Sequence, residues 1–212
     1  MKMAFEHVKP QDIERRSFEI ITAELGGRVL DPETAPIIKR AIHTTADFDY
    51  ADNLCFSAGA VAAGVRALRG GAHVVTDTQM AFSGVNKTLL HALGGQAHCF
   101  MGDPEVARQA AEQGVTRSAV CMEQAAKLPG PLIVAVGNAP TALVRLYELL
   151  RQGAIRPALI IGVPVGFVNV VEAKELIMTA EVPTIVARGR KGGSNVAAAI
   201  VNALLLLARE QA

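Results

Sequence analysis

Five short runs of apolar residues, spaced along the last two thirds of the chain, constrain its fold more than any other feature. Each run is rich in β-branched residues, and a small polar loop and a segment of helix length usually follow it; the runs are residues 72–76, 97–101, 132–136, 158–163 and 183–187. Strands that are covered on both faces are continuously apolar in this way, because neither side meets water. The alternation of strand and helix therefore predicts an α/β fold with an open, mainly parallel five-stranded sheet and helices on both faces.

The first 70 residues contain no apolar run of comparable strength and instead predict an N-terminal helical segment. Its three helices are expected over residues 10–25, from a cap at Asp31 to about residue 43, and over residues 57–69. In the first of them, Ile13, Ile20 and Leu25 are expected to mark the buried face. The connections are short and no internal repeat is found, so we expect a single domain over residues 1–212.

The composition excludes a disordered chain and argues against a nucleic-acid partner. Half of the residues are apolar, whereas segments that stay disordered are poor in apolar residues and strongly charged. The 21 Lys and Arg residues are balanced by 20 Asp and Glu residues, which gives a net charge of +1. Binding to a phosphate backbone needs a surplus of basic side chains on one face, so any basic site in this chain must be local.

The cysteines and the apolar stretches bear on where the protein works. Cys55, Cys99 and Cys121 form no Cys-x-x-Cys pair and have no second metal ligand at short spacing, which predicts neither a disulfide framework nor a metal site. The N-terminus has no apolar leader, and the most apolar stretch, residues 196–208, is too short to span a bilayer. We therefore expect a cytoplasmic protein with no membrane partner.

The chemistry is expected at the carboxyl ends of the strands, where a parallel sheet leaves a crevice and helix N-termini point N–H groups at ligands. The last predicted strand is followed there by three cations among glycines, in the loop Arg188-Gly189-Arg190-Lys191-Gly192-Gly193-Ser194-Asn195. Such a loop can cradle a carboxylate or phosphate, because glycine allows close backbone approach and arginine supplies paired donors. A solvated turn is the alternative, since a glycine-rich loop before a helix does not decide the matter alone.

Two polar residues stand out on the N-terminal helices. Ser17 falls one turn after Ile13, on or beside the apolar face, where a serine commonly bonds back to its own helix. His43 lies near the predicted end of the second helix, where the helix dipole favours a positive charge, and Asp47 and Asp49 follow it. That setting suits a proton donor, and a structural histidine that caps the last carbonyls is the alternative.

Six strings, in order along the chain, resemble those of the precorrin-8X methylmutase family. They are Arg15-Arg16-Ser17-Phe18, Arg40-Ala41-Ile42-His43-Thr44-Thr45-Ala46-Asp47, Thr76-Asp77-Thr78-Gln79-Met80, Gly137-Asn138-Ala139-Pro140-Thr141-Ala142-Leu143, Gly162-Val163-Pro164-Val165-Gly166-Phe167-Val168 and Gly189-Arg190-Lys191-Gly192-Gly193-Ser194. The resemblance extends from about residue 10 to residue 207. Any one string is a weak signal, whereas six in the same order make coincidence improbable.

The resemblance implies an isomerase of cobalamin biosynthesis. Members of this family are homodimeric α/β proteins that move a methyl group from carbon 11 to carbon 12 of the corrin precursor, by what is regarded as a 1,5-sigmatropic shift, without an organic cofactor. It thus implies a corrinoid (tetrapyrrole) substrate, precorrin-8X or cobalt-precorrin-8, and hydrogenobyrinate or cobyrinate as the product. It also implies a homodimer and no cofactor.

Site residues follow from the same resemblance. His43 matches the family's active-site histidine, thought to be a proton donor and acceptor near the migrating methyl group, and Ser17 matches a serine that contacts the substrate. The other candidates for substrate binding are Arg16, Arg40, Thr76, Arg117, Asn138, Arg188, Arg190 and Ser194. Their arginines are suited to pair with the acetate and propionate arms of the ligand.

One departure and two alternatives remain at this point. Val170, Val171 and Ala173 stand where two small residues and a serine are more usual, which puts local packing or substrate fit in question. A nucleotide- or phosphosugar-using enzyme would explain the sheet, but the Gly-x-Gly-x-x-Gly string that it needs after the first strand is missing. A non-catalytic tetrapyrrole carrier would use the same pocket without needing His43. The substrate could be metal-free or cobalt-bearing.

Overall fold

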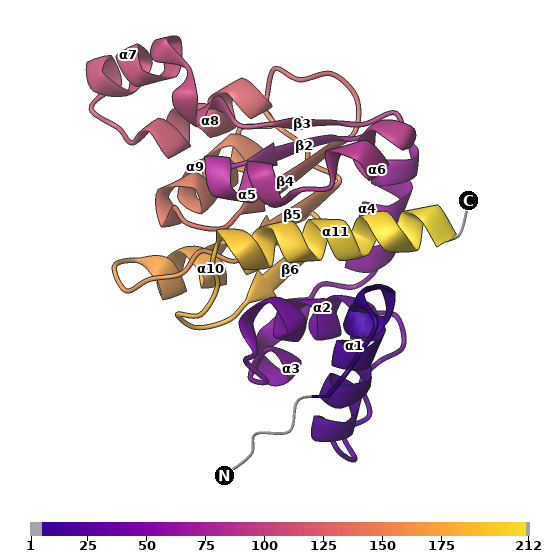
Figure 1. The fold of residues 1–212 in the computed structure, drawn as a ribbon. Coiled ribbons are helices and arrows are strands. Elements are labelled where there is room, and N and C mark those ends of the chain that lie inside the picture. Colours follow the sequence, from indigo (N-terminus) through magenta and orange to yellow (C-terminus); the bar gives the residue numbers. More distant parts are fainter. Residues whose placement is uncertain (1–5, 211–212) are drawn as a thin grey trace.

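The centre of the fold is a mixed sheet of six strands, seen in the computed structural model, which describes residues 6–210 (Figure 1). The strands lie in the order β1-β6-β5-β4-β2-β3. Their bounds are β1 (Leu54–Phe56), β2 (His73–Thr76), β3 (Gln96–His98), β4 (Leu132–Val136), β5 (Leu159–Gly162) and β6 (Thr184–Ala187). Strand β1 runs antiparallel to β6, and the other neighbours are parallel, which confirms the mainly parallel sheet.

The predicted count of five strands was one too low. Strand β1 is three residues long, and only Leu54 in it is buried, so its sequence carries no continuous apolar run. Its place is set by pairing with β6, in which Leu54 lies opposite Ala187. Strand β3 is also shorter than predicted, because Phe100–Gly102 form a turn of 3-10 helix, labelled η2.

Helices cover both faces of the sheet, as predicted, because successive strand residues point to opposite sides. Alternate residues such as Val74 and Ile133 face one core, and their neighbours Val75 and Val134 face the other. The helices α4 (Ala60–Arg69), α5 (Gln79–Gly84), α6 (Lys87–Ala92) and α11 (Ser194–Glu210) cover the first face. The helices α7 (Pro104–Gln113), α8 (Arg117–Ala125), α9 (Pro140–Arg151) and α10 (Val170–Met178) cover the second. Across residues 6–210, no helix combines the length and the apolar character that crossing a membrane requires.

The N-terminal segment is helical, as predicted, and packs below α11 (Figure 1). It comprises η1 (Pro10–Asp12), α1 (Ile13–Glu24), α2 (Ala35–Thr45) and the short α3 (Tyr50–Asn53). Helix α2 begins later than predicted, because Asp31 starts a turn in which its side chain accepts the N–H of Glu33 at 2.7 Å.

The buried face predicted for α1 was partly wrong. Ile13 is 54% exposed and Ile20 is 38% exposed, whereas Ile21 and Leu25 are buried. The helix has apolar residues on two sides, so the side turned toward the core could not be read from their spacing alone.

A buried carboxylate fixes the edge of the sheet where the strands end. Asp77 directly follows β2 and is 1% exposed. Its Oδ1 accepts the N–H of Gly137 at 2.7 Å, and its Oδ2 accepts those of Asn138 and Ala139 at 2.8 and 2.7 Å, just before α9. Burial raises the pKa of this carboxyl, and the three N–H donors oppose that effect by stabilising the charged form. Asp77 thus binds the beginning of α9 to the end of β2.

Replacing Asp77 by Asn tests this role. An Asn amide nitrogen cannot accept an N–H, so Asp77→Asn leaves buried donors unsatisfied, and we expect the free energy of unfolding to fall by about 1–3 kcal/mol. Asp103→Asn is the matched control, because Asp103 is an exposed cap that accepts the N–H of Glu105 at 2.8 Å and Asn caps helices equally well. Urea unfolding measures both, and equal stability of the two variants would contradict this role of Asp77.

Candidate active site

Five of the predicted substrate-binding residues, Thr76, Asn138, Arg188, Arg190 and Ser194, lie at strand ends or in the loops just beyond, along the edge of the sheet where the parallel strands end. Figure 1 shows the strands of this edge. Ser194 begins α11, and its hydroxyl lies 2.7 Å from that of Thr78 in the turn after β2. Thr76 is fully buried and donates its hydroxyl to the carbonyl oxygen of Thr78 at 3.1 Å, so its side chain serves the turn itself. Asn138 is exposed in the turn that Asp77 holds. Arg188 directly follows β6.

The three cations of the loop over residues 188–193 have three different surroundings. Arg188 donates two hydrogen bonds to the carboxylate of Glu175, both at 2.9 Å. Lys191 reaches away from the loop to Asp47 and Asp49, at 2.6 and 2.5 Å. The guanidinium carbon of Arg190 lies 5.5 Å from the centre of the exposed Phe167 ring. Of the three, only Arg190 makes no ion pair within residues 6–210, so it is the cation left for an anionic ligand.

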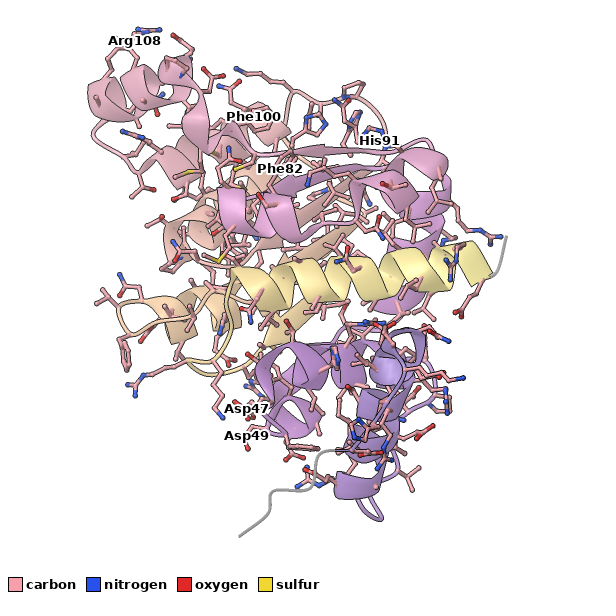
Figure 2. The ribbon with its side chains drawn as sticks, viewed as in Figure 1. Asp47, Asp49, Phe82, His91, Phe100 and Arg108 are labelled. Carbon is pink, nitrogen blue, oxygen red and sulfur yellow. The ribbon has the colours of Figure 1, made fainter. Side chains whose placement is uncertain are left out.

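The ion pairs of Lys191 join the basic loop to the helix that carries His43. Helix α2 ends at Thr45, Ala46 turns the chain with a φ of 54°, and Asp47 and Asp49 follow beside α3 (Figure 2). The hydrogen bond from Lys191 lowers the pKa of Asp47, and the two carboxylates raise the pKa of Lys191. These ion pairs therefore connect the end of α2 to the carboxyl edge of the sheet.

His43 is exposed in the last turn of α2, with its ring stacked on Phe18 of α1. The ring centres are 5.3 Å apart and the planes differ by 11°. Arg40 packs on the same phenyl ring, at 4.8 Å, and forms an ion pair with Glu14. Stacking on Phe18 orients the imidazole, and within the described part of the chain neither of its ring nitrogens is hydrogen-bonded.

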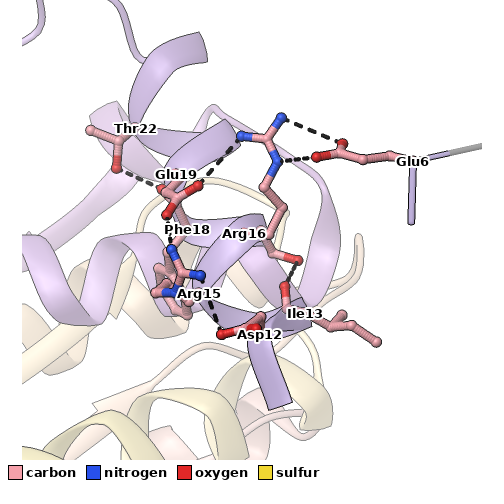
Figure 3. Close-up of polar contacts among 9 residues, drawn as sticks. Glu6, Asp12, Ile13, Arg15, Arg16, Phe18, Glu19 and Thr22 are labelled. Atoms are coloured by element: carbon pink, nitrogen blue, oxygen red, sulfur yellow. Dashed lines mark hydrogen bonds and ion pairs between the residues drawn. The ribbon is translucent and has the colours of Figure 1, made fainter. Parts of the chain in front are cut away.

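Ser17 and Arg16 make local contacts on α1. The hydroxyl of Ser17 donates to the carbonyl oxygen of Ile13 at 2.9 Å, which is the bond back to its own helix that serines commonly form. Arg16 lies in a surface network with Glu6 at 2.7 Å and Glu19 at 3.4 Å (Figure 3). Neither side chain is hydrogen-bonded to His43.

Arg117 stands beside the beginning of α9. It is the exposed first residue of α8, and hydroxyl contacts of 2.9 and 3.1 Å join Thr116 and Ser118 to Thr141 of α9. Within residues 6–210 it makes no ion pair. Arg117 and Arg190 are therefore two cations at the carboxyl edge that remain available to a ligand.

Sequence reasoning missed three exposed apolar side chains in the segments that follow β2 and β5. Met80 is 72% exposed after β2, and Phe167 and Val168 are 80% and 78% exposed after β5. Their signal was present, because loops that follow buried strands are usually polar and these are not. Each of these side chains can contact an apolar ligand that binds at this edge.

Lys174 was also missed. It is fully buried on α10, and its Nζ donates to the carbonyl oxygens of Gly189 and Lys191, each at 2.8 Å. Burial lowers its pKa to about 8. The only signal was a lysine within an otherwise apolar face of a predicted helix.

The departures from the expected pattern lie on the same helix. Val170 and Ala173 are each 2% exposed and Val171 is half-buried. Ala173 packs into the core beneath the second face of the sheet. These residues therefore concern the packing of α10.

A separate hollow of about 400 Å³ lies at the opposite, amino edge of β5 and β6. It is lined by Tyr147, Leu150, Arg151, Ile155, Arg156 and Val182, among others. None of the predicted site residues lines it, so we place the candidate site at the carboxyl edge. Within residues 6–210, no three His, Cys, Asp or Glu side chains are grouped to hold a metal.

The arrangement suits a planar, anionic ligand. His43 offers an oriented group for proton exchange, the exposed apolar residues offer a surface for a ring system, and Arg190 and Arg117 offer donors for carboxylates.

Comparison with known proteins identifies the family of the chain. The family model described as precorrin-8X methylmutase matches residues 12–207. The cobalt-precorrin-8 methylmutase of Salmonella typhimurium is 47% identical, with coverage of 95% of this chain and 97% of that protein. The precorrin-8X methylmutase of Pseudomonas aeruginosa is 42% identical, with coverage of 92% and 94%.

A solved structure agrees as well. The precorrin-8X methylmutase from Thermus thermophilus is 42% identical and superposes with a TM-score of 0.86, over 94% of this chain and 98% of that one. These matches decide against a nucleotide enzyme and a non-catalytic carrier. The chain belongs to the precorrin-8X methylmutase family and is a methyl-transferring isomerase of cobalamin biosynthesis.

Proposed function

We propose that this isomerase moves a methyl group from carbon 11 to carbon 12 of precorrin-8X or cobalt-precorrin-8, with His43 as proton donor and acceptor. The observation that carries the proposal is the setting of His43, which is exposed, stacked on Phe18 and fastened to the carboxyl edge through Asp47 and Asp49. We also place the protein in the cytoplasm, which the free thiols of its three cysteines support.

The reaction asks the protein for proton placement and for shape. A macrocycle that is protonated at the right position has an electron-poor conjugated system, within which the methyl group can migrate without an external carrier. His43 supplies and removes that proton, and such general acid catalysis typically contributes ~10²- to 10⁴-fold. Binding the reactive tautomer more tightly than the others lowers the barrier further.

The remaining residues of the edge hold the substrate. Phe167, Val168 and Met80 would offer apolar contacts to the macrocycle, while Arg190 and Arg117 would pair with its carboxylate arms. Cobalt, where the substrate carries it, would be held by the macrocycle itself. The assay therefore uses both the metal-free and the cobalt-bearing precursor.

His43→Ala tests the proton-transfer role. We expect turnover to fall by about 10²- to 10⁴-fold. The fold and the binding of the corrinoid product should stay largely intact, because the imidazole is exposed and its packing is limited to the stacking on Phe18. His91→Ala is the matched control, since His91 is an exposed histidine on α6 (Figure 2). Near wild-type turnover of His43→Ala, measured with both precursors, would remove His43 from the mechanism.

Arg190→Ala tests whether Arg190 pairs with a carboxylate arm of the ligand. A charge-assisted contact is worth roughly 1.5–3 kcal/mol, so we expect free-acid hydrogenobyrinate to bind about one to two decades more weakly. A corrinoid whose arms are amidated should lose much less affinity, because the group that faces Arg190 is then neutral. Arg156→Ala, at the opposite edge, serves as the control. If the free-acid and the amidated corrinoid lost affinity equally, Arg190 would contribute to the shape of the site and would not recognise the charge of the ligand.

We further propose a homodimer whose interface includes the outer side of α1. Ile13, Ser17 and Ile20 are spaced four and three residues apart and share that side, on which both isoleucines are exposed. A two-fold interface repeats the same patch on both chains, so the dimer would carry two equivalent sites, each near His43.

Light scattering tests the dimer. We expect twice the chain mass for the wild type and a shift toward monomer for Ile20→Glu, because the new charge would be buried at the interface. Val29→Glu is the control, since Val29 is 96% exposed and lies in the turn after α1. A wild-type monomer that is fully active at the assay concentration would refute the dimer.

A further inference from the structure

Lys174 is a buried cation that the reaction described above does not use. Its side chain is fully buried on α10, and no carboxylate within residues 6–210 pairs with it. Taking an ammonium group out of water is costly, and chains avoid it where an apolar residue would serve. The presence of a buried lysine at this position must therefore be explained by the groups that its ammonium binds.

The Nζ of Lys174 holds one loop at two points. It donates to the carbonyl oxygens of Gly189 and Lys191, each at 2.8 Å. The carbonyl oxygen between them, that of Arg190, accepts the N–H of Gly166 at 3.1 Å. Three successive carbonyl groups are thus bound by the protein interior or by the loop after β5.

The same loop is pressed against the end of β5. The N–H of Gly193 donates to the carbonyl oxygen of Val163 at 2.9 Å. A Cβ on Gly192 would lie 2.1 Å from that oxygen, so the approach is open to glycine alone. The hydrogen bonds from Lys174 and the close packing of these glycines together restrict the loop to one backbone conformation.

The backbone conformation of the loop sets the directions of its three cationic side chains. Because Lys174 holds the loop backbone, Arg190 lies over Phe167 and Lys191 reaches Asp47 and Asp49. Glu175, the next residue of α10, holds Arg188 at the side. Helix α10 therefore sets the loop through two neighbouring side chains.

We propose that Lys174 is a positioning residue of the substrate site, which fixes the loop over residues 188–193 so that Arg190 meets a carboxylate arm of the corrinoid. The inference rests on the proposed function for the identity of the ligand. Lys174 itself touches no substrate, because it lies wholly beneath the loop.

Trypsin tests the hold on the loop without any substrate. Trypsin cleaves after Arg and Lys, and the loop offers Arg188, Arg190 and Lys191. Lys174→Met keeps an unbranched side chain but removes the donors, so cleavage in the loop, mapped by mass spectrometry, should become about tenfold faster or more, as expected when an ordered segment opens locally. Lys127→Met is the matched control, because Lys127 is exposed and donates only to Gln124.

Steady-state kinetics test the effect on the site. Loss of the positioned Arg190 should raise KM for the free-acid precursor by about tenfold. We expect kcat to fall less, because His43 keeps its stacking on Phe18 even when Lys191 no longer holds Asp47 and Asp49. Amidated corrinoid should bind to Lys174→Met as it does to the wild type. If Lys174→Met does not fold, Lys174→Gln, whose amide can donate to one of the two carbonyls, should show the same changes to a smaller extent.

The outcomes separate this inference from the proposed function. Unchanged cleavage in the folded variant would show that Lys174 does not hold the loop and would overturn the inference. A loosened loop with an unchanged KM would overturn it as well, while turnover by the wild type would leave the proposed function standing. Wild type that turns over neither precursor would refute the proposed function, and the trypsin result would still decide whether Lys174 holds the loop.

Discussion

The carboxylate of Asp77 sets the edge of the sheet on which the rest of the site depends. In an open parallel sheet the N–H groups at the start of a helix often bind an anionic ligand. Here Asp77 fills that place at α9 with its own oxygens, at 2.7 to 2.8 Å from three N–H groups. The protein therefore needs other groups to receive an anion, and the cations beside this turn, Arg190 and Arg117, can do so.

The N-terminal helices join this edge by packing and by charge. The buried residues of α2, such as Ile38 and Ile42, belong to the core that α11 covers, and this apolar contact provides the stability. The ion pairs of Lys191 with Asp47 and Asp49 are partly exposed, and exposed ion pairs add little to stability. Their importance is geometric, because they fix the end of α2, and with it His43, relative to the loop that carries Arg190.

The sequence was sufficient for what depends on burial along the chain. Strands covered on both faces are continuously apolar, so the parallel sheet and its helices could be predicted. Strand β1 could not, because a three-residue edge strand with a single buried residue leaves no pattern. The exposed Ile13 and Ile20 were assigned to the core, since spacing marks an apolar side of a helix without saying what covers it.

The candidate site was predictable in its location and less so in its contacts. Strand ends predicted that Asn138 and Ser194 lie in turns at the carboxyl edge, and helix signals predicted that His43 lies near a helix end; the structure has both features. The partners of the loop cations depend on distant segments, as with Lys191 and Asp49, which are 142 residues apart. Arg188, Arg190 and Lys191 look equivalent in the sequence, and only the fold shows that two of them are neutralised by carboxylates and one is not. Lys174 was overlooked for a related reason, because a lysine is normally solvated.

The most direct test of this account is a crystal structure of the protein with bound hydrogenobyrinate. We expect the macrocycle to lie against Phe167 at the carboxyl edge, with a ring nitrogen of His43 within hydrogen-bonding distance of it and a carboxylate arm paired with Arg190. A corrinoid bound instead in the hollow beside Tyr147 and Arg156, with His43 turned to solvent, would contradict it.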